Sequence, residues 1–390
     1  MRLFKPRKVD EGAARYVRGD APSFDQKNEM FKRPFWDPEV RDLFQRFYKD
    51  KVSPKDKPGY RLKDQAVVNA AWHLESHFGC GVSGGRTGLY DWTWNGRFDF
   101  PRVPRGLKID ADDPAAVTRD MKRVARFFGA SLVGVGRLDR RWLYSKAYLL
   151  TPEGGKVAEN EIPEEYAYAV VLGFAMDYGA VACSPAHPAS ATVGLQYSRM
   201  AFVAGLLAQF IRGLGFKAIP CGNDTACSIP LAIDAGLGEL GRNGLLITPE
   251  YGPRVRLAKV LTDLPLVPDR PIAFGVWEFC QQCGLCAKQC PSQSIMHGEP
   301  STETHNISNR RNVHAWHINA ENCLDFWARN GTDCSNCIRV CPFNKPAGWI
   351  HNLAKAAIMR LPALDPAFLR IDGLLGYGGR RDPETFWKET

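Results

Sequence analysis

The pattern of apolar and polar positions predicts a layered arrangement of strands and helices in the middle of the chain. Residues 113–130 (DPAAVTRDMKRVARFFGA) place apolar side chains at helical spacing and predict an amphipathic helix, and residues 131–138 (SLVGVGRL) predict a strand. Tyr166–Met176 is almost entirely apolar, which is typical of a central strand. Residues 216–220 and Val255–Thr262 predict two further strands. This alternation indicates an α/β fold.

Further helices are predicted on either side of these strands. The clearest is Ala191–Leu214, whose apolar stripe consists of Val193, Tyr197, Met200, Ala204, Leu207, Ile211 and Leu214. A short helix is expected from Pro38 to Tyr48 and another in the tail, at residues 349–364. Residues 78–96 (FGCGVSGGRTGLYDWTWNG) predict a loop whose glycines allow the backbone to approach a ligand closely.

Composition and charge narrow the class of protein only a little. The chain has 390 residues, of which 45% are apolar and 24% charged, as in an ordinary globular protein. No run of about eighteen apolar residues occurs, so no membrane-spanning segment is expected. The net charge is +9, but the signs are mixed along the chain, which favours a solvated surface over a site for nucleic acid.

Eight of the twelve cysteines lie between Cys280 and Cys341, in two related runs. The first run has the spacing C-x2-C-x2-C-x3-C-P, which is the bacterial ferredoxin pattern for a [4Fe–4S] cluster, and its fourth cysteine ligates the other cluster. The first cluster is therefore assigned to Cys280, Cys283, Cys286 and Cys341. The second is assigned to Cys290, Cys323, Cys334 and Cys337. The remaining cysteines are expected to be buried, inert thiols: Cys80, Cys183, Cys221 and Cys227.

Two zinc sites are the alternative interpretation of these cysteines, because zinc knuckles also use C-x2-C pairs. A triple run paired with a reciprocal C-x3-C-P favours iron–sulfur clusters instead. Two clusters that exchange ligands must lie close together, so the region predicts a path for single electrons into the rest of the protein.

The order of these parts resembles the corrinoid-dependent reductive dehalogenases. The resemblance rests on residues 241–266 (GRNGLLITPEYGPRVRLAKVLTDLPL), followed by the two cysteine runs, and it extends from about Tyr60 to the end of the chain. The same modules occur in epoxyqueuosine reductases, which act on tRNA and are the main competitor. Those enzymes use an Asp as their acid and often add C-terminal helical repeats, whereas only about fifty residues follow Cys341 here.

The resemblance implies a nitroreductase-like α/β core that binds a cobamide, with a ferredoxin-like domain holding two [4Fe–4S] clusters. The cobamide is expected base-off, and none of the eight histidines lies in a D-x-H-x-x-G motif. The expected divisions are a loop-rich segment packing on the core (1–110), the corrinoid-binding α/β domain (111–270), the cluster domain (271–348) and a tail completing the core (349–390).

The resemblance also implies a catalytic set of a tyrosine, an asparagine and a basic residue, which fall on Tyr197, Asn223 and Arg256. Trp327 resembles an aromatic residue of the substrate pocket. Each residue also has a structural interpretation. Tyr197 lies on the apolar stripe of its helix, Asn223 lies in a turn-like CGNDT stretch, Arg256 could pair with an acidic residue at the surface, and Trp327 could pack beside the second cluster.

The chemistry explains why such residues would be needed. Replacing a carbon–halogen bond by carbon–hydrogen takes two electrons and one proton, and Tyr197 is the expected proton donor. A nearby cation such as Arg256 is expected to lower the tyrosine pKa from about 10 toward the working pH. Asn223 can donate a hydrogen bond to the phenolate or to the departing halide.

The expected partners are a small organohalide and an electron donor, either a protein or a quinol-linked membrane anchor subunit. No nucleic acid is expected, and a homodimer is allowed. The expected location is the outer face of the cytoplasmic membrane after removal of a leader, with a cytoplasmic enzyme as the alternative. A simple electron-transfer subunit is a third interpretation, but the large α/β region before the cysteines argues against it.

Overall fold

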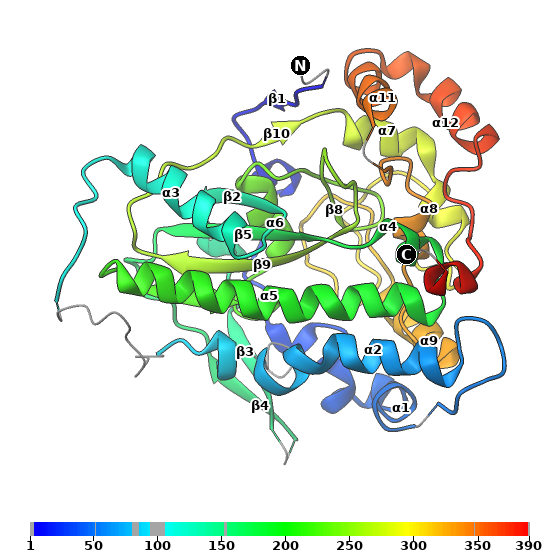
Figure 1. Cartoon of the computed structure of the whole chain (residues 1–390), viewed down its shortest axis with the longest axis horizontal. Helices are drawn as coiled ribbons and strands as arrows, with labels where there is room; N and C mark the ends of the chain where they lie inside the picture. Colours follow the sequence, from blue (N-terminus) through cyan, green and yellow to red (C-terminus); the bar gives the residue numbers. More distant parts are fainter. Residues whose placement is uncertain are drawn as a thin grey trace.

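The computed structural model describes residues 4–50, 52–79, 86–93, 106–151, 154–346 and 348–388, and a four-stranded antiparallel sheet lies at its centre (Figure 1). The strand order is β2-β5-β9-β6, with every neighbouring pair antiparallel. The strands are β2 (Leu132–Arg137), β5 (Tyr168–Ala175), β6 (Ala218–Cys221) and β9 (Val255–Thr262). The four predicted strands are therefore present, and the apolar strand β5 lies inside the sheet.

Side chains of β5 alternate between two apolar cores, one on each face of the sheet. Val170, Leu172 and Phe174 pack toward the core shared with helices α3 (Pro114–Phe127) and α5 (His187–Gly213). Ala169 and Val171 pack on the other face, in the core shared with helix α6 (Ser228–Asp234). Because successive side chains of a strand point to opposite faces, a strand covered on both sides must be apolar throughout.

Helix α2 (Leu62–Leu74) lies along α5 on the side away from the sheet (Figure 1). This helix lies in the segment that was expected to be rich in loops, and its sequence pattern did not predict it. Its apolar residues do not keep to one helical face, so the period that identified α3 and α5 is weak here. Of the predicted ligand-approach loop, residues 80–85 and 94–96, including Cys80, lie outside the described part of the chain.

The cysteine-rich segment folds into short helices beside the sheet. Gly284, in the left-handed region at φ 62°, separates two of them and lets the chain turn between Cys283 and Cys286. The helices are α7 (Val276–Cys283), α8 (Leu285–Lys288), α9 (Ala320–Asn330) and α10 (Asn336–Arg339).

The C-terminal tail was expected to complete the α/β core. It contacts two regions, the cysteine-rich segment and helix α2. Helices α11 (Trp349–Arg360) and α12 (Asp365–Leu374) share an apolar core with Phe279 of α7. The last short helix, Pro383–Trp387, instead returns to α2, where Trp387 Nε1 donates to Asp64 Oδ1 at 2.7 Å. The tail therefore covers the cysteine-rich segment first and the α2 side of the core last.

The described residues also form three small two-stranded sheets and, among other short helices, α1 (Arg41–Phe44) and α4 (Tyr178–Ala182). The strand pairs are β1 (Arg7–Lys8) with β10 (Ile272–Ala273), β3 (Lys146–Thr151) with β4 (Gly154–Glu159), and β7 (Glu239–Leu240) with β8 (Leu246–Ile247). Among the residues described, none of the helices combines the length and apolar character needed to cross a membrane.

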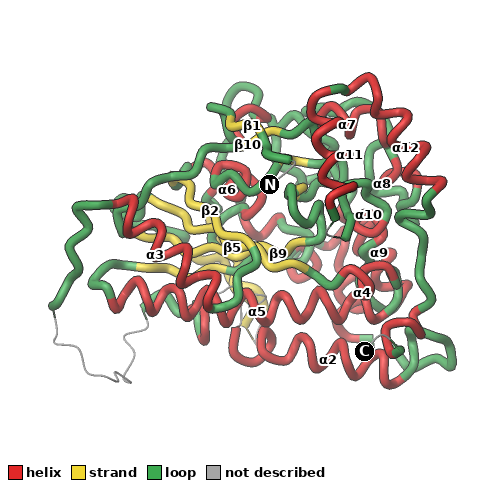
Figure 2. The backbone as a smooth tube through the Cα atoms, turned by 45° about the horizontal axis from the view of Figure 1, so that its top comes forward, coloured by secondary structure: helices red, strands yellow, loops and turns green. Residues whose placement is uncertain are grey.

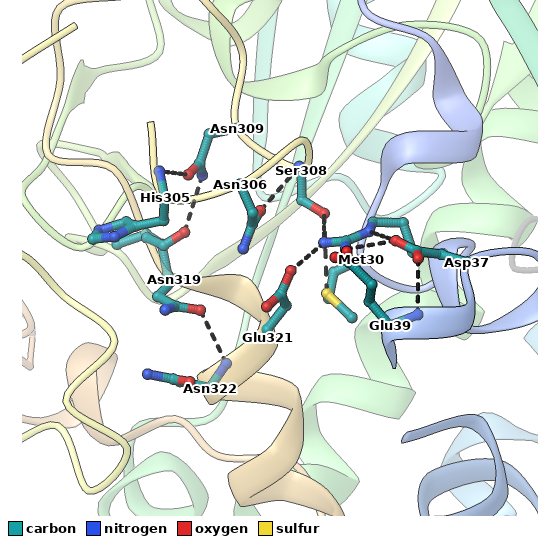
Figure 3. Close-up of polar contacts among 12 residues, drawn as sticks. Met30, Asp37, Glu39, His305, Asn306, Ser308, Asn309, Asn319, Glu321 and Asn322 are labelled. Atoms are coloured by element: carbon teal, nitrogen blue, oxygen red, sulfur yellow. Dashed lines mark hydrogen bonds and ion pairs between the residues drawn. The ribbon is translucent and has the colours of Figure 1, made fainter. Parts of the chain in front are cut away.

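The N-terminal segment is tied to α9 by the buried guanidinium of Arg33. Arg33 Nη2 contacts Asp37 Oδ2 at 2.6 Å, and Nη1 contacts Glu321 Oε1 at 2.5 Å. Nη1 also donates to Ser308 Oγ at 3.2 Å, and Figure 3 shows Asp37, Ser308 and Glu321 converging on this point. A buried charge with several partners is costly to break, so this contact holds two distant segments together.

Candidate functional site

Tyr197, Asn223 and Arg256 come together at one place in the structure. Nδ2 of Asn223 donates a hydrogen bond of 2.6 Å to the phenolic oxygen of Tyr197. The guanidinium carbon of Arg256 lies 5.9 Å from the centre of the Tyr197 ring. The three residues come from α5, from the loop after β6 and from the start of strand β9, so the tertiary fold assembles them.

The Tyr197 ring is held by stacking on Trp72 of α2. The ring centres are 4.8 Å apart and the planes are inclined by 26°. The indole can lie this close because residue 194 is glycine, where a Cβ atom would come within 2.4 Å of Trp72 Cδ1. The sequence alone did not indicate Trp72, because no motif connects it to Tyr197.

The loop that carries Asn223 is held by hydrogen bonds from Lys259, a fully buried residue of β9. Its ammonium group donates to the carbonyl of Ala226 at 2.8 Å, to Ser228 Oγ at 3.1 Å and to the carbonyl of Gly222. Thr225 adopts φ 70°, a left-handed conformation that strains a β-branched residue. A strained loop held by a buried cation can keep Asn223 in one position.

A second support reaches the same loop from the N-terminal segment. The hydroxyl of Tyr144 donates to Glu29 Oε1 at 2.6 Å and approaches the backbone oxygen of Asn223 at 3.3 Å. Burial raises the pKa of the Glu29 carboxyl, and the hydrogen bond from Tyr144 lowers it in part. Tyr144 therefore connects Glu29 to the backbone of Asn223, and the side chain of Asn223 donates to Tyr197.

Burial raises the pKa of Tyr197 above its ordinary value of 10.0, although Arg256 and the Asn223 hydrogen bond each lower it. The sequence-based prediction was right about the effect of Arg256 and wrong about the net direction. The desolvation of a phenolate in this half-buried position outweighs one cation near its ring. Tyr197 therefore remains a neutral phenol, with its proton in place, across the neutral pH range.

Four of the cysteines line one small hollow. Its lining includes Cys280, Cys283, Cys286 and Cys341. Burial raises the pKa of the Cys280 thiol to about 12, and the neighbouring Cys283 raises it as well. Within the described ranges, no three His, Cys, Asp or Glu side chains converge closely enough to hold a single metal ion. Thiols around a hollow fit a larger centre such as an iron–sulfur cube.

The other four cysteines form a second set. Burial raises the pKa of the Cys337 thiol, and Cys334, Cys323 and Cys290 raise it further because their charges lie nearby. The two sets adjoin, since Cys286 of the first set packs with Cys290 and Cys337 of the second against Ala287 and Ile295. The structure therefore brings together the two sets that the spacing of the runs predicts.

The second set lies beside Tyr197. Cys337 and Tyr197 pack against the same apolar cluster, which includes Val193 and Ile338. The Arg256 cation lowers both the Cys337 pKa and the Tyr197 pKa. Arg256 is therefore close enough to influence both the second set and the phenol.

Arg242 and Asn243 were not predicted as site residues. The buried Arg242 guanidinium donates to the backbone oxygens of Cys280 at 3.0 Å, Met296 at 2.8 Å and Gly298 at 2.8 Å. Asn243 Nδ2 reaches the backbone oxygen of Cys337 at 3.4 Å. The sequence feature that could have identified them is the GRNG stretch at residues 241–244, before the cysteine runs. Its arginine is buried in the structure instead of exposed to solvent.

Trp327 lies in a different cluster from the Tyr197 trio. Its ring packs 5.7 Å from Phe31 and 6.2 Å from Phe47, between α9 and the N-terminal segment. Within the described structure its Nε1 is buried without a hydrogen-bond partner. The pocket role assigned to Trp327 stays a prediction, because its recorded ring contacts are with the N-terminal segment.

Comparisons with known proteins place this geometry in context. A family model described as a 4Fe-4S double cluster binding domain matches residues 279–344. The tetrachloroethene reductive dehalogenase of Sulfurospirillum multivorans is 36% identical over 397 residues, which cover 92% of this chain and 78% of the relative. That of Desulfitobacterium hafniense is 39% identical over 334 residues, covering 76% of this chain and 60% of the relative.

A solved reductive dehalogenase, whose structure suggests a mechanism for B12-dependent dehalogenation, has a similar fold. The TM-score is 0.71 at 24% identity, over 96% of this chain and 49% of the other. The chain thus spans about three fifths of the Desulfitobacterium relative and half of the solved structure.

Proposed function

Because the chain belongs to the reductive dehalogenase family, we propose that it replaces a carbon–halogen bond of a small organohalide by a carbon–hydrogen bond. The reaction is R–X + 2 e⁻ + H⁺ → R–H + X⁻, so it needs single electrons and one proton. The observation that supports the proposal most is the hydrogen bond between Asn223 and Tyr197 beside Arg256. Such a trio can hold a proton at one oxygen and deliver it.

In this proposal Tyr197 donates the proton to the carbon that loses the halide. Arg256 stabilises the negative charge that the phenol oxygen gains, and Asn223 directs that oxygen. General-acid assistance of this kind contributes about 10²–10⁴ in rate. Because burial raises the Tyr197 pKa, the phenol already carries its proton at neutral pH and needs no other group to protonate it first.

The electrons would pass through two [4Fe–4S] clusters to a base-off cobamide. When bound, a cobamide would supply a low-valent metal centre able to give the two electrons that reduction of the carbon–halogen bond needs. Among the described residues, Arg256 Nε and Asp333 Oδ1 are buried without hydrogen-bond partners, and Arg256 lowers the Asp333 pKa that burial raises. An unpaired buried donor and an unpaired buried acceptor would suit a ligand with amides on its rim, as a corrinoid has.

The order of the two clusters follows from their neighbours. The second set lies against the apolar cluster of Tyr197, so it would pass electrons to the substrate site. The first set lies beside α7, α11 and α12, so it would receive them. The electron donor would be a protein or a quinol-linked membrane anchor subunit, at the outer face of the cytoplasmic membrane.

The test uses the chain reconstituted anaerobically with iron, sulfide and a cobamide. Tetrachloroethene is the first substrate to try, because both relatives are named for it. With an artificial reductant, the parent protein should release chloride, and Tyr197→Phe should lose about 10²–10⁴ of the rate while retaining iron and cobalt. Tyr168→Phe, on strand β5, is the matched control and should keep the rate.

Two results would contradict parts of the proposal. Chloride release by Tyr197→Phe at the parental rate would exclude the proton-donor role. A parent protein that loads iron but no cobalt and releases no halide would indicate an electron-transfer subunit instead.

A further inference from the structure

The sulfur of Cys290 receives two hydrogen bonds from residues that follow it in the chain. Ser292 Oγ lies 3.3 Å from Cys290 Sγ, and the backbone N–H of Ser294 donates to the same sulfur at 3.4 Å. The two serine hydroxyls also meet, with 2.6 Å between their oxygens. A cysteine that ligates iron is a thiolate and has no proton to donate. With a cluster bound, the Ser292 hydroxyl must therefore donate to the sulfur, and the Ser294 hydroxyl to the Ser292 oxygen.

The turn that directs these donors contains a strained residue. Gln293 has φ 52°, in the left-handed region that residues with a Cβ atom rarely adopt. Its side-chain Nε2 donates to the backbone oxygen of Cys290 at 2.8 Å, and its backbone N–H donates to the same oxygen at 3.2 Å. The backbone N–H of Asn319 holds the next residue by donating to the Ser294 oxygen at 2.8 Å. Strain of this kind persists only where the surroundings hold it, and it clusters at functional sites.

Little water can replace these donors, because the turn is buried. Cys290 is 8% exposed and Ser294 is 2% exposed. In such surroundings a hydrogen bond to a charged group is stronger than in water, and linked hydrogen bonds strengthen one another. An iron–sulfur cluster gains one negative charge when it is reduced, and hydrogen bonds to its sulfurs help to set its potential. Donors directed at the Cys290 sulfur therefore favour the reduced form of the cluster that this cysteine ligates.

Cys290 lies in the first cysteine run but is assigned to the second set. It packs with Cys286 and Cys337 at the point where the two sets adjoin. Figure 2 shows α8, which precedes Cys290, beside α10, which carries Cys337. Cys337 shares an apolar cluster with Tyr197. The two serines therefore act on the cluster that lies nearer to the Tyr197 site.

We propose that Ser292 and Ser294 raise the reduction potential of the second cluster through their hydrogen bonds to the Cys290 sulfur. Each electron that the second cluster accepts leaves the first cluster oxidised by one electron, so the charge balances. A higher potential at the acceptor makes this transfer more favourable. Onward delivery of the electron to the site beside Tyr197 rests on the proposed function, whereas the effect of the serines on the potential does not.

The test is a redox titration of the full chain after anaerobic reconstitution with iron and sulfide. Electron paramagnetic resonance follows each cluster, and the second cluster is the one whose signal is missing from Cys323→Ala. Ser292→Ala should lower the equilibrium constant for reduction of the second cluster about tenfold, which is about 59 mV for one electron. The first cluster should keep the parental potential in this variant.

Three further variants separate the hydroxyl from the rest of the side chain. Ser292→Thr keeps the hydroxyl and should titrate near the parent. Ser294→Ala keeps the N–H donor and loses only the second hydroxyl, so its shift should be smaller and in the same direction. Ser301→Ala is the matched control and should titrate as the parent does, because its hydroxyl oxygen accepts from the Glu303 N–H at 2.9 Å instead of contacting a cysteine.

Three results would overturn the proposal. They are a parental or higher potential in Ser292→Ala, a shift in Ser292→Thr as large as that in Ser292→Ala, or an equal shift of both clusters in Ser292→Ala. Iron content and circular dichroism establish that each variant is folded and loaded. If Ser292→Ala does not assemble its clusters, Ser294→Ala decides, and a parental potential in that variant overturns the proposal. A chain that shows the expected potentials but releases no halide would leave this proposal standing and contradict the proposed function.

Discussion

The amide of Asn223 donates a 2.6 Å hydrogen bond to the phenol of Tyr197, although 26 residues separate them in the chain. The bond fixes the phenol oxygen from a loop that Lys259 and Tyr144 hold in turn. A proton donor works only when its oxygen is directed at the reacting atom, so the support of this loop matters as much as Tyr197 itself.

Replacing Asn223 by alanine should lower the rate of halide release by about 10²–10³, the usual cost of removing one positioned donor. Cofactor content should not change, because no cysteine contact is lost. Single-turnover kinetics with preloaded enzyme would measure the effect. An unchanged rate in this variant would mean that the hydrogen bond has no role in proton delivery.

The pH dependence should follow the raised pKa of Tyr197. Its phenol stays neutral below about 10, so a rate limited by its proton should be flat through neutral pH and fall above that value. Because the fold favours the neutral phenol, its contribution to stability is present below the unfolded pKa and is lost as pH rises through the folded one.

The pH dependence of the rate in Arg256 variants shows whether the positive charge of this residue, and not only its size, affects Tyr197. Arg256→Met removes the cation that lowers the Tyr197 pKa, so its alkaline fall should move to higher pH. Arg256→Lys should keep the fall near that of the parent. Rates between pH 6 and 11, with circular dichroism at each pH, would measure this. A parental fall between pH 7 and 8 would argue against Tyr197 as the limiting donor.

Removing Cys290 should damage the second cluster, although this cysteine belongs to the first run. Its neighbours in the structure are Cys323, Cys334 and Cys337. Cys290→Ala should therefore lose the electron paramagnetic resonance signal of the cluster near Tyr197, and Cys341→Ala should lose the other. Cys221→Ser, a buried thiol outside both sets, is the control and should keep all iron. The reverse assignment of signals would mean that the ligands are not exchanged.

Arg242 should set the reduction potential of the first cluster. Its buried cation lies beside Cys280, and its backbone N–H contacts Cys280 Sγ at 3.5 Å. Removing a positive charge disfavours the reduced cluster, so Arg242→Met should lower the potential, by about 59 mV for each 1.4 kcal/mol lost. Arg242→Lys keeps the charge and should shift the potential less. Redox titration would measure both, and a higher potential in the methionine variant would contradict the prediction.

Lys259 should contribute strongly to stability. Lys259→Met would leave the oxygens of Gly222, Ala226 and Ser228 without their buried donor, at about 1–3 kcal/mol for each unsatisfied group. Thermal unfolding should show a clearly lower Tm, together with a lower rate as Asn223 loses its support. Lys217→Met, at an exposed ion pair with Glu165, should change the Tm little. Equal Tm values in the two variants would contradict this role.

Local patterns were enough to predict much of the fold and the two cysteine sets. The strands β2, β5, β6 and β9 and the helix α5 follow from the repeat of their own residues, and a ligand run is recognisable from its spacing. Such features depend on residues only a few positions apart in the chain, so they can be recognised from the sequence alone. The resemblance to a family then pointed to Tyr197, Asn223 and Arg256, which local patterns alone would have left as core, turn and surface residues.

Other features depended on contacts between residues far apart in the chain, and no local pattern records these. Helix α2 is set by its packing on α5, and Trp72 reaches Tyr197 only because Gly194 leaves room. The net rise of the Tyr197 pKa depends on how much water the fold removes, a quantity that the sequence cannot state. Arg242 and Lys259 acquired their roles for the same reason: a buried cation takes its function from the carbonyl groups that the tertiary structure brings to it.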